Sequence, residues 1–228
     1  MSRKHTDDLE NIIVFTDGSC SRNGKVGALG GIGIHFPDKE LKDISKIYDK
    51  DYCTNQKTEL YAILQALKYI NARLGLSKYR VFLKTDSMYS INCVTKWVNG
   101  WMNNGWKTKS GSPVSNKDLI EPIYKYYSRY NIILEHVDAH TGDDDYDSIG
   151  NEKADKLATN ATKKAQLNEK ANKAPSRPKP KIPRKRPARR APSGSKTSIP
   201  RKKSVPKKRQ PITSMEDNVI VELIHNSK

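Results

Sequence analysis

Short runs of apolar residues, many of them β-branched, recur along the first 140 residues and predict β-strands. The first run, Ile12–Phe15, ends at an Asp-Gly pair, and two more follow at 32–36 and 44–48. Two further runs, at 81–83 and 132–134, lie between longer segments. Glycines punctuate the second run without the G-x-G-x-x-G spacing of a phosphate loop, so a closely packed hairpin strand is the better interpretation. The pattern therefore predicts five short strands.

Helical spacing begins after the third of these runs. Apolar residues at positions 60, 63, 64, 67 and 70 fall on one face of a helix, which Thr54 or Asn55 can cap. Similar patterns predict helices at 88–97, 119–127 and 150–164. Three strands, followed by helices that alternate with two more strands, are typical of the α/β class.

The amino-acid composition changes sharply after residue 162. Residues 161–210 contain 19 of the 42 Lys and Arg residues but a single acid, and nine of the 12 prolines lie at 175–211. Such a segment buries too little apolar surface to offset its chain entropy, so we predict a disordered basic tail. The expected organisation is an N-terminal extension (1–10), a folded domain (11–162), the basic tail (163–211) and a short apolar and acidic end (212–228).

The composition also excludes several classes of protein. No apolar run approaches the ~20 residues of a membrane span, and the charged N-terminus lacks the apolar centre of a signal peptide. The cysteines, Cys20, Cys53 and Cys93, do not have metal-site spacing, and their odd number favours free, buried thiols inside a cell. The net charge of +17 favours a polyanionic partner, with nucleic acid first and an anionic membrane surface second.

Four acidic residues are candidates for a shared site: Asp17, Glu59 and Asp86 lie near the ends of predicted elements, and Asp155 lies in the last predicted helix. Carboxylates at the ends of neighbouring strands converge on one edge of a sheet, where four of them repel one another unless divalent cations neutralise them. Mg²⁺ prefers such oxygen ligands, and two ions about 4 Å apart activate a water for phosphoryl transfer. The alternative, that each acid is a cap or turn residue, fits each one singly but not the set.

Each of the four carboxylates lies in a short motif. The motifs are Thr-Asp-Gly-Ser at 16–19, Thr-Asn-Gln-Lys-Thr-Glu at 54–59, Thr-Asp-Ser at 85–87 and Gly-Asn-Glu-Lys-Ala-Asp at 150–155. In this order they resemble the metal-binding motifs of type 1 ribonuclease H, over residues 10–162. The resemblance implies the family's α/β fold, a five-stranded mixed sheet with its first three strands antiparallel, flanked by helices. It also implies an endonuclease that uses two Mg²⁺ ions, or Mn²⁺ in their place, to hydrolyse the RNA strand of RNA–DNA hybrids, leaving 5′-phosphates.

The resemblance extends to residues outside these motifs. His140 matches the family's flexible-loop histidine, which implies proton transfer or help with product release. The acidic run at 143–147 lengthens this loop and is expected to bind a cation or repel substrate. The Trp-rich segment at 97–108 resembles the family's basic protrusion but has few cations. The implied substrate-binding residues are, for the RNA strand, Ser19, Asn23, Asn55, Gln56 and Met88, and, for the DNA strand, Thr54, Tyr89, Trp97, Trp101 and Asn116.

The basic tail allows three interpretations: added affinity for nucleic-acid phosphates, a nuclear-localisation signal at 183–186 and 207–209, or solubility. The residues before Asn11 are too few for the hybrid-binding domain of full-length eukaryotic enzymes, so we expect the tail to replace that domain. The segment 218–224 is either a peptide that binds a protein partner or a strand that folds back.

We expect a monomer from a eukaryote or from a virus of eukaryotes. Two alternatives to ribonuclease H activity are a related nuclease of the same superfold, such as an integrase or a resolvase, and a catalytically inactive protein that only binds nucleic acid.

Overall fold

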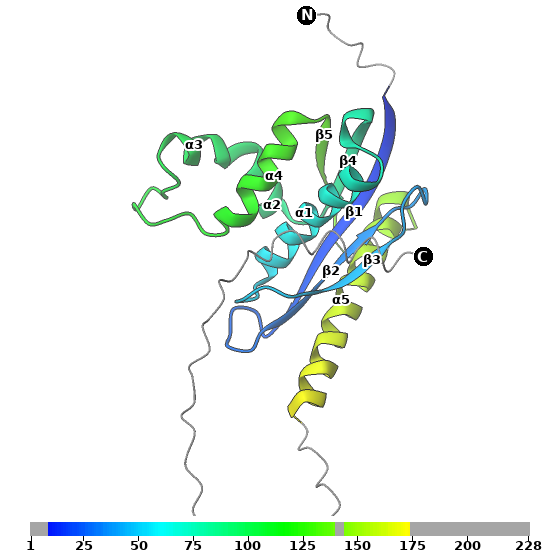
Figure 1. The fold of residues 1–228 in the computed structure, drawn as a ribbon, viewed down its shortest axis with the longest axis vertical. Coiled ribbons are helices and arrows are strands. Elements are labelled where there is room, and N and C mark those ends of the chain that lie inside the picture. Colours follow the sequence, from blue (N-terminus) through cyan, green and yellow to red (C-terminus); the bar gives the residue numbers. More distant parts are fainter. Residues whose placement is uncertain (1–8, 140–143, 174–228) are drawn as a thin grey trace, which may run out of the picture. The chain divides into compact units, whose positions relative to one another are not determined.

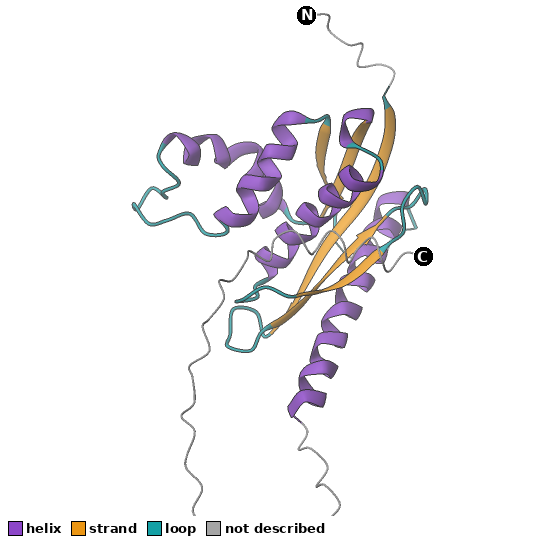
Figure 2. Ribbon diagram, viewed as in Figure 1, coloured by secondary structure: helices purple, strands orange, loops and turns teal. Residues whose placement is uncertain are grey.

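The computed structural model describes residues 9–139 and 144–173. Within these ranges a sheet of five strands has helices on both of its faces (Figures 1 and 2). Two short elements are a 3₁₀ helix, η2, and a π-helical turn, η3. In chain order the elements are β1 (Glu10–Ser21), β2 (Leu29–His35), β3 (Ile44–Tyr48), α1 (Asn55–Arg73), η2 (Leu76–Lys78), β4 (Tyr79–Thr85), α2 (Met88–Asn92), η3 (Cys93–Trp97), α3 (Val98–Asn103), α4 (Lys117–Arg129), β5 (Ile132–His136) and α5 (Tyr146–Lys173).

The strands lie in the order β3-β2-β1-β4-β5. Strands β1, β2 and β3 pair antiparallel, whereas β4 and β5 run parallel to β1. Parallel neighbours need long crossover connections, and helix α1 and helices α2 to α4 provide them. The predicted five-stranded mixed sheet, with its first three strands antiparallel, is therefore confirmed.

Helix α1 packs on β1 and β2 and contacts α4 on its other side. The apolar residues at 60, 63, 64, 67 and 70, which predicted this helix, are all buried. Thr54, also a predicted DNA-side residue, caps the helix, because its hydroxyl accepts a hydrogen bond from the backbone N–H of Lys57 at 3.2 Å. Ile120 and Ile123 of α4 complete the same core. Each such side chain contributes about 1.5–3 kcal/mol when fully buried.

Helix α5 crosses the opposite face of the sheet, over β1, β2 and β3 (Figure 1). The residues that it buries include Ala154, Ala158, Ala161 and Ala165. Because these side chains are small, the helix axis lies close to the sheet. This closeness matters for the position of Asp155.

Among the predicted boundaries that differ from the structure, three have a clear structural basis. The first strand continues past Asp17 to Ser21, because its antiparallel pairing with β2 reaches Leu29. The helix predicted at 88–97 is divided among α2, η3 and α3 and follows a helical path to Asn103. Within it, the Thr95 hydroxyl donates to the Ile91 carbonyl, a bond typical of perturbed helix turns.

The third difference is at the end of the domain. Helix α5 continues to Lys173, so the prediction that the disordered tail starts at residue 163 is wrong for 163–173. The reason is tertiary: Ala165 is buried, and Arg22 at the end of β1 forms a 2.9 Å ion pair with Glu169. These contacts extend the helix beyond its apolar pattern.

Several predictions concern residues outside the described ranges. They are the role of His140, the basic tail from residue 174 to 211, the end of the chain at 212–228 with its segment 218–224, and most of the N-terminal extension. Among the residues that are described, no helix combines the length and the hydrophobicity needed to cross a membrane.

Candidate active site

Asp17 and Asp86 come together where the pairing of β1 with β4 ends. The last parallel pair joins Phe15 of β1 to Lys84 of β4. Asp17 and Asp86 each follow two residues later, so the same register places them at neighbouring positions on this edge. Beyond this point β1 continues as the partner of β2, with Asp17 opposite Gly33.

Glu59 reaches this edge because Gly18 has no side chain. A Cβ atom on Gly18 would lie 2.2 Å from the backbone nitrogen of Glu59 and 2.3 Å from the carbonyl carbon of Thr58. The backbone of α1 therefore touches β1 directly at the residue after Asp17. Only glycine permits this approach, and it brings the Glu59 side chain to the site.

Asp155 arrives from the other face of the sheet by a similar contact. A Cβ atom on Gly33 would lie 2.0 Å from the carbonyl oxygen of Ala154 and 2.7 Å from the backbone nitrogen of Ala158. Gly33 is the partner of Asp17 across the β1–β2 ladder. Helix α5 thus touches the sheet beside Asp17, and Asp155 follows Ala154 directly.

The electrostatics of Asp17 couple it to the other three carboxylates. Its side chain is only 8% exposed. The pKa of Asp17 is raised from 3.8 to about 7. Burial is the largest cause, the negative charges of Asp86, Asp155 and Glu59 add to it, and the hydrogen bond from the Gly18 N–H opposes it. Burial also raises the pKa of Glu59, with a further contribution from Asp86, although the Ser87 hydroxyl opposes it.

Neutral side chains hold three of these carboxylates. The Ser87 hydroxyl donates a short hydrogen bond to Glu59. Asn151 Nδ2 donates to Asp86 Oδ2 at 3.4 Å, and the Thr159 hydroxyl donates to Asp155 Oδ1 at 3.2 Å. Ser87 and Asn151 are not among the predicted site residues. The available signal was their position inside the motifs at 85–87 and 150–155.

The side chain of Asn151 also has a hydrogen-bond acceptor that is unpaired within the described part of the chain. Its side chain is 3% exposed, and its Oδ1 atom has no hydrogen-bond partner among the described residues. A buried amide oxygen without a partner costs about 1–3 kcal/mol. Asn151 therefore has a vacant acceptor next to the carboxylate that it orients.

The donor set fits a hard divalent cation. All four charged groups offer oxygen atoms, the ligands that Mg²⁺ prefers, and a bound cation would relieve the repulsion that raises the pKa of Asp17. In the part of the chain that the structure describes, no three His, Cys, Asp or Glu side chains stand close enough together to form a metal-binding group. Glu59 and Asp155 instead bond to the hydroxyls of Ser87 and Thr159. The site thus has suitable donors, which must turn toward one another to enclose an ion.

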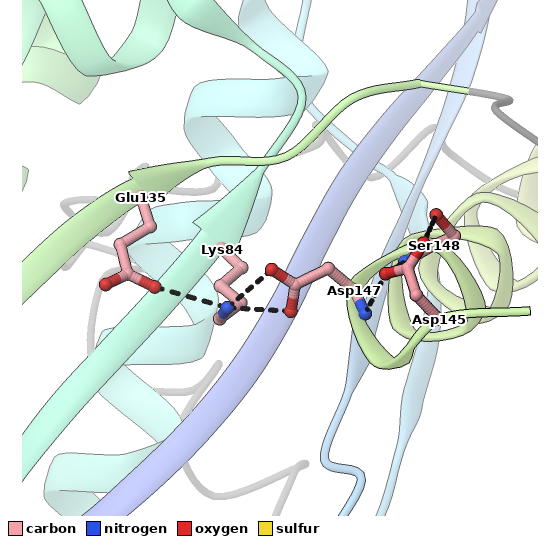
Figure 3. A network of polar contacts seen from close by, with 5 residues as sticks. All are labelled: Lys84, Glu135, Asp145, Asp147 and Ser148. Atoms are coloured by element: carbon pink, nitrogen blue, oxygen red, sulfur yellow. Dashed lines mark hydrogen bonds and ion pairs between the residues drawn. The ribbon is translucent and has the colours of Figure 1, made fainter. Parts of the chain in front are cut away.

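A nearly buried lysine ties the start of α5 to the sheet (Figure 3). Lys84 Nζ lies 2.7 Å and 2.8 Å from the two carboxylate oxygens of Asp147, and 3.3 Å from Glu135 Oε2. Burial lowers the pKa of Lys84, but the two carboxylates outweigh burial and leave the pKa raised. Asp145 accepts hydrogen bonds from the backbone N–H groups of Asp147 and Ser148. The acidic run that was expected to bind a cation or repel substrate thus supplies a helix cap and an ion pair.

The predicted RNA-side residues gather around the start of α1. Asn23, in the turn after β1, accepts a hydrogen bond from the backbone N–H of Asn55 at 3.0 Å. Asn55 and Gln56 are exposed in the first turn of α1, and Ser19 lies half-buried on β1. Met88, 46% exposed, lies two residues after Asp86 at the start of α2. We call the surface formed by Ser19, Asn23, Asn55 and Gln56 the α1 rim.

Four of the predicted DNA-side residues are aromatic or contact an aromatic ring. The ring centroids lie 6.1 Å apart for Tyr89 and Trp97, 5.8 Å for Trp97 and Trp101, and 6.3 Å for Trp101 and Trp106. Asn116 Nδ2 donates to the Tyr89 hydroxyl at 3.0 Å. Tyr89, Trp97, Trp101 and Trp106 therefore form a row of neighbouring rings, which we call the aromatic row. It brings the predicted residues together and adds Trp106, which the sequence did not assign.

An α/β fold with four carboxylates from β1, α1, the end of β4 and α5 defines the ribonuclease H-like class of proteins. A family model for RNase H matches residues 9–163. The chain is 54% identical over 143 residues to a "Probable ribonuclease H" from Acanthamoeba polyphaga mimivirus, covering 63% of this chain and 62% of the relative. It is 36% identical over 158 residues to "Ribonuclease H1" from Mus musculus, covering 69% of this chain and 52% of the relative. The chain belongs to the ribonuclease H family.

Solved structures agree with this assignment. LC9-RNase H1, described as "a type 1 RNase H with the type 2 active-site motif", is 25% identical with a TM-score of 0.53, covering 69% of this chain and 74% of that one. The foamy viral protease-reverse transcriptase in complex with dsDNA is 25% identical with a TM-score of 0.54, covering 66% of this chain and 93% of that one. The resemblance to type 1 ribonuclease H is confirmed. The chain spans 62% and 52% of the lengths of the two curated relatives named above.

Proposed function

We propose that this chain cuts the RNA strand of RNA–DNA hybrids with the help of two divalent metal ions, Mg²⁺ first. The observation that carries the proposal is the electrostatic coupling of Asp17 to Asp86, Asp155 and Glu59 in a member of the ribonuclease H family. Packing of the fold does not require four carboxylates in one place, and their repulsion opposes folding. Binding of divalent cations would account for this arrangement.

In this proposal Asp17, Glu59, Asp86 and Asp155 hold the ions. When bound, such ions would supply an activated water and would stabilise negative charge on the phosphate and on the leaving oxygen. Hydrolysis joins the oxygen of water to phosphorus and breaks the bond between phosphorus and the 3′ oxygen, which takes a proton. The products are a 5′-phosphate and a 3′-hydroxyl.

Other residues of the chain position the carboxylates and move protons. Ser87 and Asn151 hold Glu59 and Asp86, so each carboxylate keeps one oxygen oriented by a neutral donor. We assign proton transfer to His140, because an imidazole side chain is able to take up and release a proton near neutral pH. His140 lies outside the described residues, so this role rests on its place in the sequence motif.

The two predicted surfaces support a distinction between RNA and DNA strands. The α1 rim offers exposed amide groups, which pair with 2′-hydroxyls as donors and as acceptors. The aromatic row from Tyr89 to Trp106 offers apolar ring surfaces, with Trp97 42% exposed. Such surfaces pack on deoxyribose, which lacks the 2′-hydroxyl. We therefore assign the RNA strand to the α1 rim and the DNA strand to the aromatic row.

A cleavage assay tests the proposal. The full chain is incubated with labelled RNA–DNA hybrid, RNA duplex and DNA duplex of one sequence, with Mg²⁺ or with EDTA. We expect cleavage only of the RNA strand of the hybrid and only with Mg²⁺. Cleavage of a DNA junction would favour a resolvase or integrase, and hybrid binding without cleavage would favour an inactive nucleic-acid-binding protein.

Two substitutions test the metal-binding roles. Asp17→Asn and Asp86→Asn each remove one ligand charge at nearly constant size, so we expect at least about a 100-fold loss of kcat with the fold retained. Asp138→Asn is the matched control, because the Asp138 side chain is 83% exposed. Near-wild-type rates in either site variant refute the assigned roles.

A further inference from the structure

Two cysteine thiols face each other across the boundary between β1 and the start of α1. The Sγ atoms of Cys20 and Cys53 lie 2.9 Å apart, and both residues are free thiols. A disulfide bond is about 2.05 Å long, so the two sulfur atoms need to approach by less than about 1 Å. The two residues are 33 positions apart in the sequence, and only the fold brings them together.

The two thiols differ in their access to solvent. Cys53 is 4% exposed and is wedged against β2, where a Cβ atom on Gly30 would lie 2.5 Å from its Sγ. Cys20 is half-buried on β1. Burial and the hydrogen bond to Cys20 raise the pKa of the Cys53 thiol. Cys20 is therefore the sulfur that meets an external reagent first, with Cys53 behind it.

We propose that Cys20 and Cys53 form a reversible oxidation site, which closes to an intramolecular disulfide and weakens binding of the hybrid at the α1 rim. With a small disulfide such as glutathione disulfide, Cys20 attacks one sulfur and releases one glutathione thiol. Cys53 then attacks the Cys20 sulfur and releases the second thiol. One glutathione S–S bond is exchanged for one protein S–S bond, and two electrons and two protons pass to glutathione.

The position of the pair connects it to substrate binding. Cys53 directly precedes Thr54 and the rim residue Asn55, and its carbonyl accepts the Gly24 N–H at 3.4 Å. Cys20 directly follows Ser19, so both cysteines lie within two residues of a rim residue in the chain. Closing the bond moves this backbone. A hydrogen bond weakens when the distance between its donor and acceptor grows by a few tenths of an ångström, so we expect the rim to hold the hybrid less tightly. This part of the inference rests on the proposed function.

Oxidation of the full chain in glutathione buffers tests the site without any measurement of activity. We expect free thiols to fall from three to one and peptide mapping to find a link between Cys20 and Cys53. We expect the Tm to rise by on the order of 10 °C, because the link closes a loop of more than 30 residues. Dithiothreitol should reverse both changes. Three remaining thiols, a link to Cys93 or a dimer through disulfides overturns the proposal.

Cysteine variants test whether the change in Tm comes from Cys20 and Cys53. Cys20→Ser and Cys53→Ser should each lose the Tm shift, whereas Cys93→Ala, which removes the third thiol, should keep it. Binding of a fluorescent hybrid is measured by anisotropy in EDTA, where no metal-dependent cleavage takes place. We expect the Kd of the oxidised wild type to rise several-fold and that of Cys20→Ser to stay constant under the same oxidant.

The outcomes separate this inference from the proposed function. An equal Kd for the reduced and the oxidised wild type overturns the effect on binding. If the reduced protein binds hybrid but does not cleave it with Mg²⁺, the proposed activity fails. The thiol count and the change in Kd still decide the oxidation site in that case.

Discussion

At the scale of single residues, the Asp17 carboxylate destabilises the fold but serves the proposed chemistry. It is almost buried and is repelled by the charges of three other acids, so its pKa rises to about 7. Near neutral pH the metal-free protein therefore carries an unfavourable charge in its interior. A divalent cation bound as proposed would use the same charge, so the residue that destabilises the fold would also provide binding energy for metal.

The pH dependence of stability follows from this shift. The unfolded chain releases the Asp17 proton near pH 3.8, whereas the folded chain keeps it to about pH 7. Between these values the folded state binds more protons, so the free energy of unfolding falls as the pH rises, and above about pH 7 the loss is complete. We expect Asp17→Asn to stabilise the metal-free protein by about 2–4 kcal/mol at pH 8, and not at pH 3.5. Urea unfolding in EDTA at the two pH values measures the difference.

Metal and a surface variant control this measurement. Mg²⁺ should raise the Tm of the wild type by several degrees more than that of Asp17→Asn, since the variant has lost a charged ligand. Asp138→Asn, at an exposed position, should change stability by less than about 0.5 kcal/mol at either pH. Equal stability of Asp17→Asn and wild type at pH 8 would show that Asp17 does not have the raised pKa.

At the scale of elements, two glycines determine where helices touch the sheet. Gly18 lies under α1, and Gly33 lies under α5, on opposite faces. The two are neighbours in the β1–β2 ladder, since Gly33 pairs with Asp17 and Gly18 follows it. The sheet is thus thin at the site, and helices from both sides bring their acids to it.

Gly33→Ala should therefore damage both stability and activity. The new Cβ atom would lie 2.0 Å from the Ala154 carbonyl oxygen, so α5 must move away and take Asp155 with it. We expect a loss of about 3 kcal/mol or more in urea unfolding and a fall in kcat larger than the change in KM. Gly100→Ala in α3 is the control, because nothing lies within 4 Å of its added Cβ atom. That variant should match or exceed wild-type stability.

Lys84 is expected to hold the first turn of α5 in place. Lys84→Met removes the cation between Asp147 and Glu135, so it should cost about 1–2 kcal/mol, because the partners are partly exposed. Hydrogen exchange should accelerate at residues 146–150, and Lys84→Arg should restore part of the protection. Lys156→Met breaks an exposed pair with Glu152 and should change neither quantity measurably. Unchanged exchange in Lys84→Met would show that α5 is held by its packing alone.

At the scale of the whole molecule, most of the excess positive charge lies in a different part of the chain from the fold and the candidate site. The net charge is +17, and residues 174–228 hold 16 Lys and Arg against three acids. The preceding residues, which carry the fold and the site, are close to neutral. We propose that the basic segment binds phosphates without regard to sequence, with nuclear import through its clusters at 183–186 and 207–209 as a second role.

Removal of residues 174–228 tests this role and leaves α5 complete to Lys173. The truncated chain should have a higher KM for hybrid, a flatter dependence of KM on salt and a kcat within about twofold of the full chain, because fewer phosphates are neutralised. A full-length variant with the Lys and Arg of 183–209 changed to Gln controls for loss of length. An unchanged KM and salt slope in both forms would assign the segment to import or solubility, which localisation with and without it would then decide.

The sequence by itself determined the fold class, the five strands and the core face of α1, and it singled out the four acids as candidates. These features follow from local pattern: apolar periodicity reports which face is buried, and short motifs mark where chemistry is concentrated. The same local logic failed for the end of α5, where residues 165 to 173 lack a clear apolar pattern but gain a contact with the turn after β1, through Glu169 and Arg22.

Only the tertiary structure decided how the acids meet and what surrounds them. Residues up to 138 positions apart are joined by the register of β1 and β4 and by the glycine contacts that bring in α1 and α5. A local sequence pattern does not show contacts between residues so far apart in the chain. The same is true of Asn151 beside Asp86, of Lys84 beside Asp147 and of the thiol pair of Cys20 and Cys53. Burial and charge proximity are properties of packing, so the raised pKa of Asp17 exists only in the folded chain.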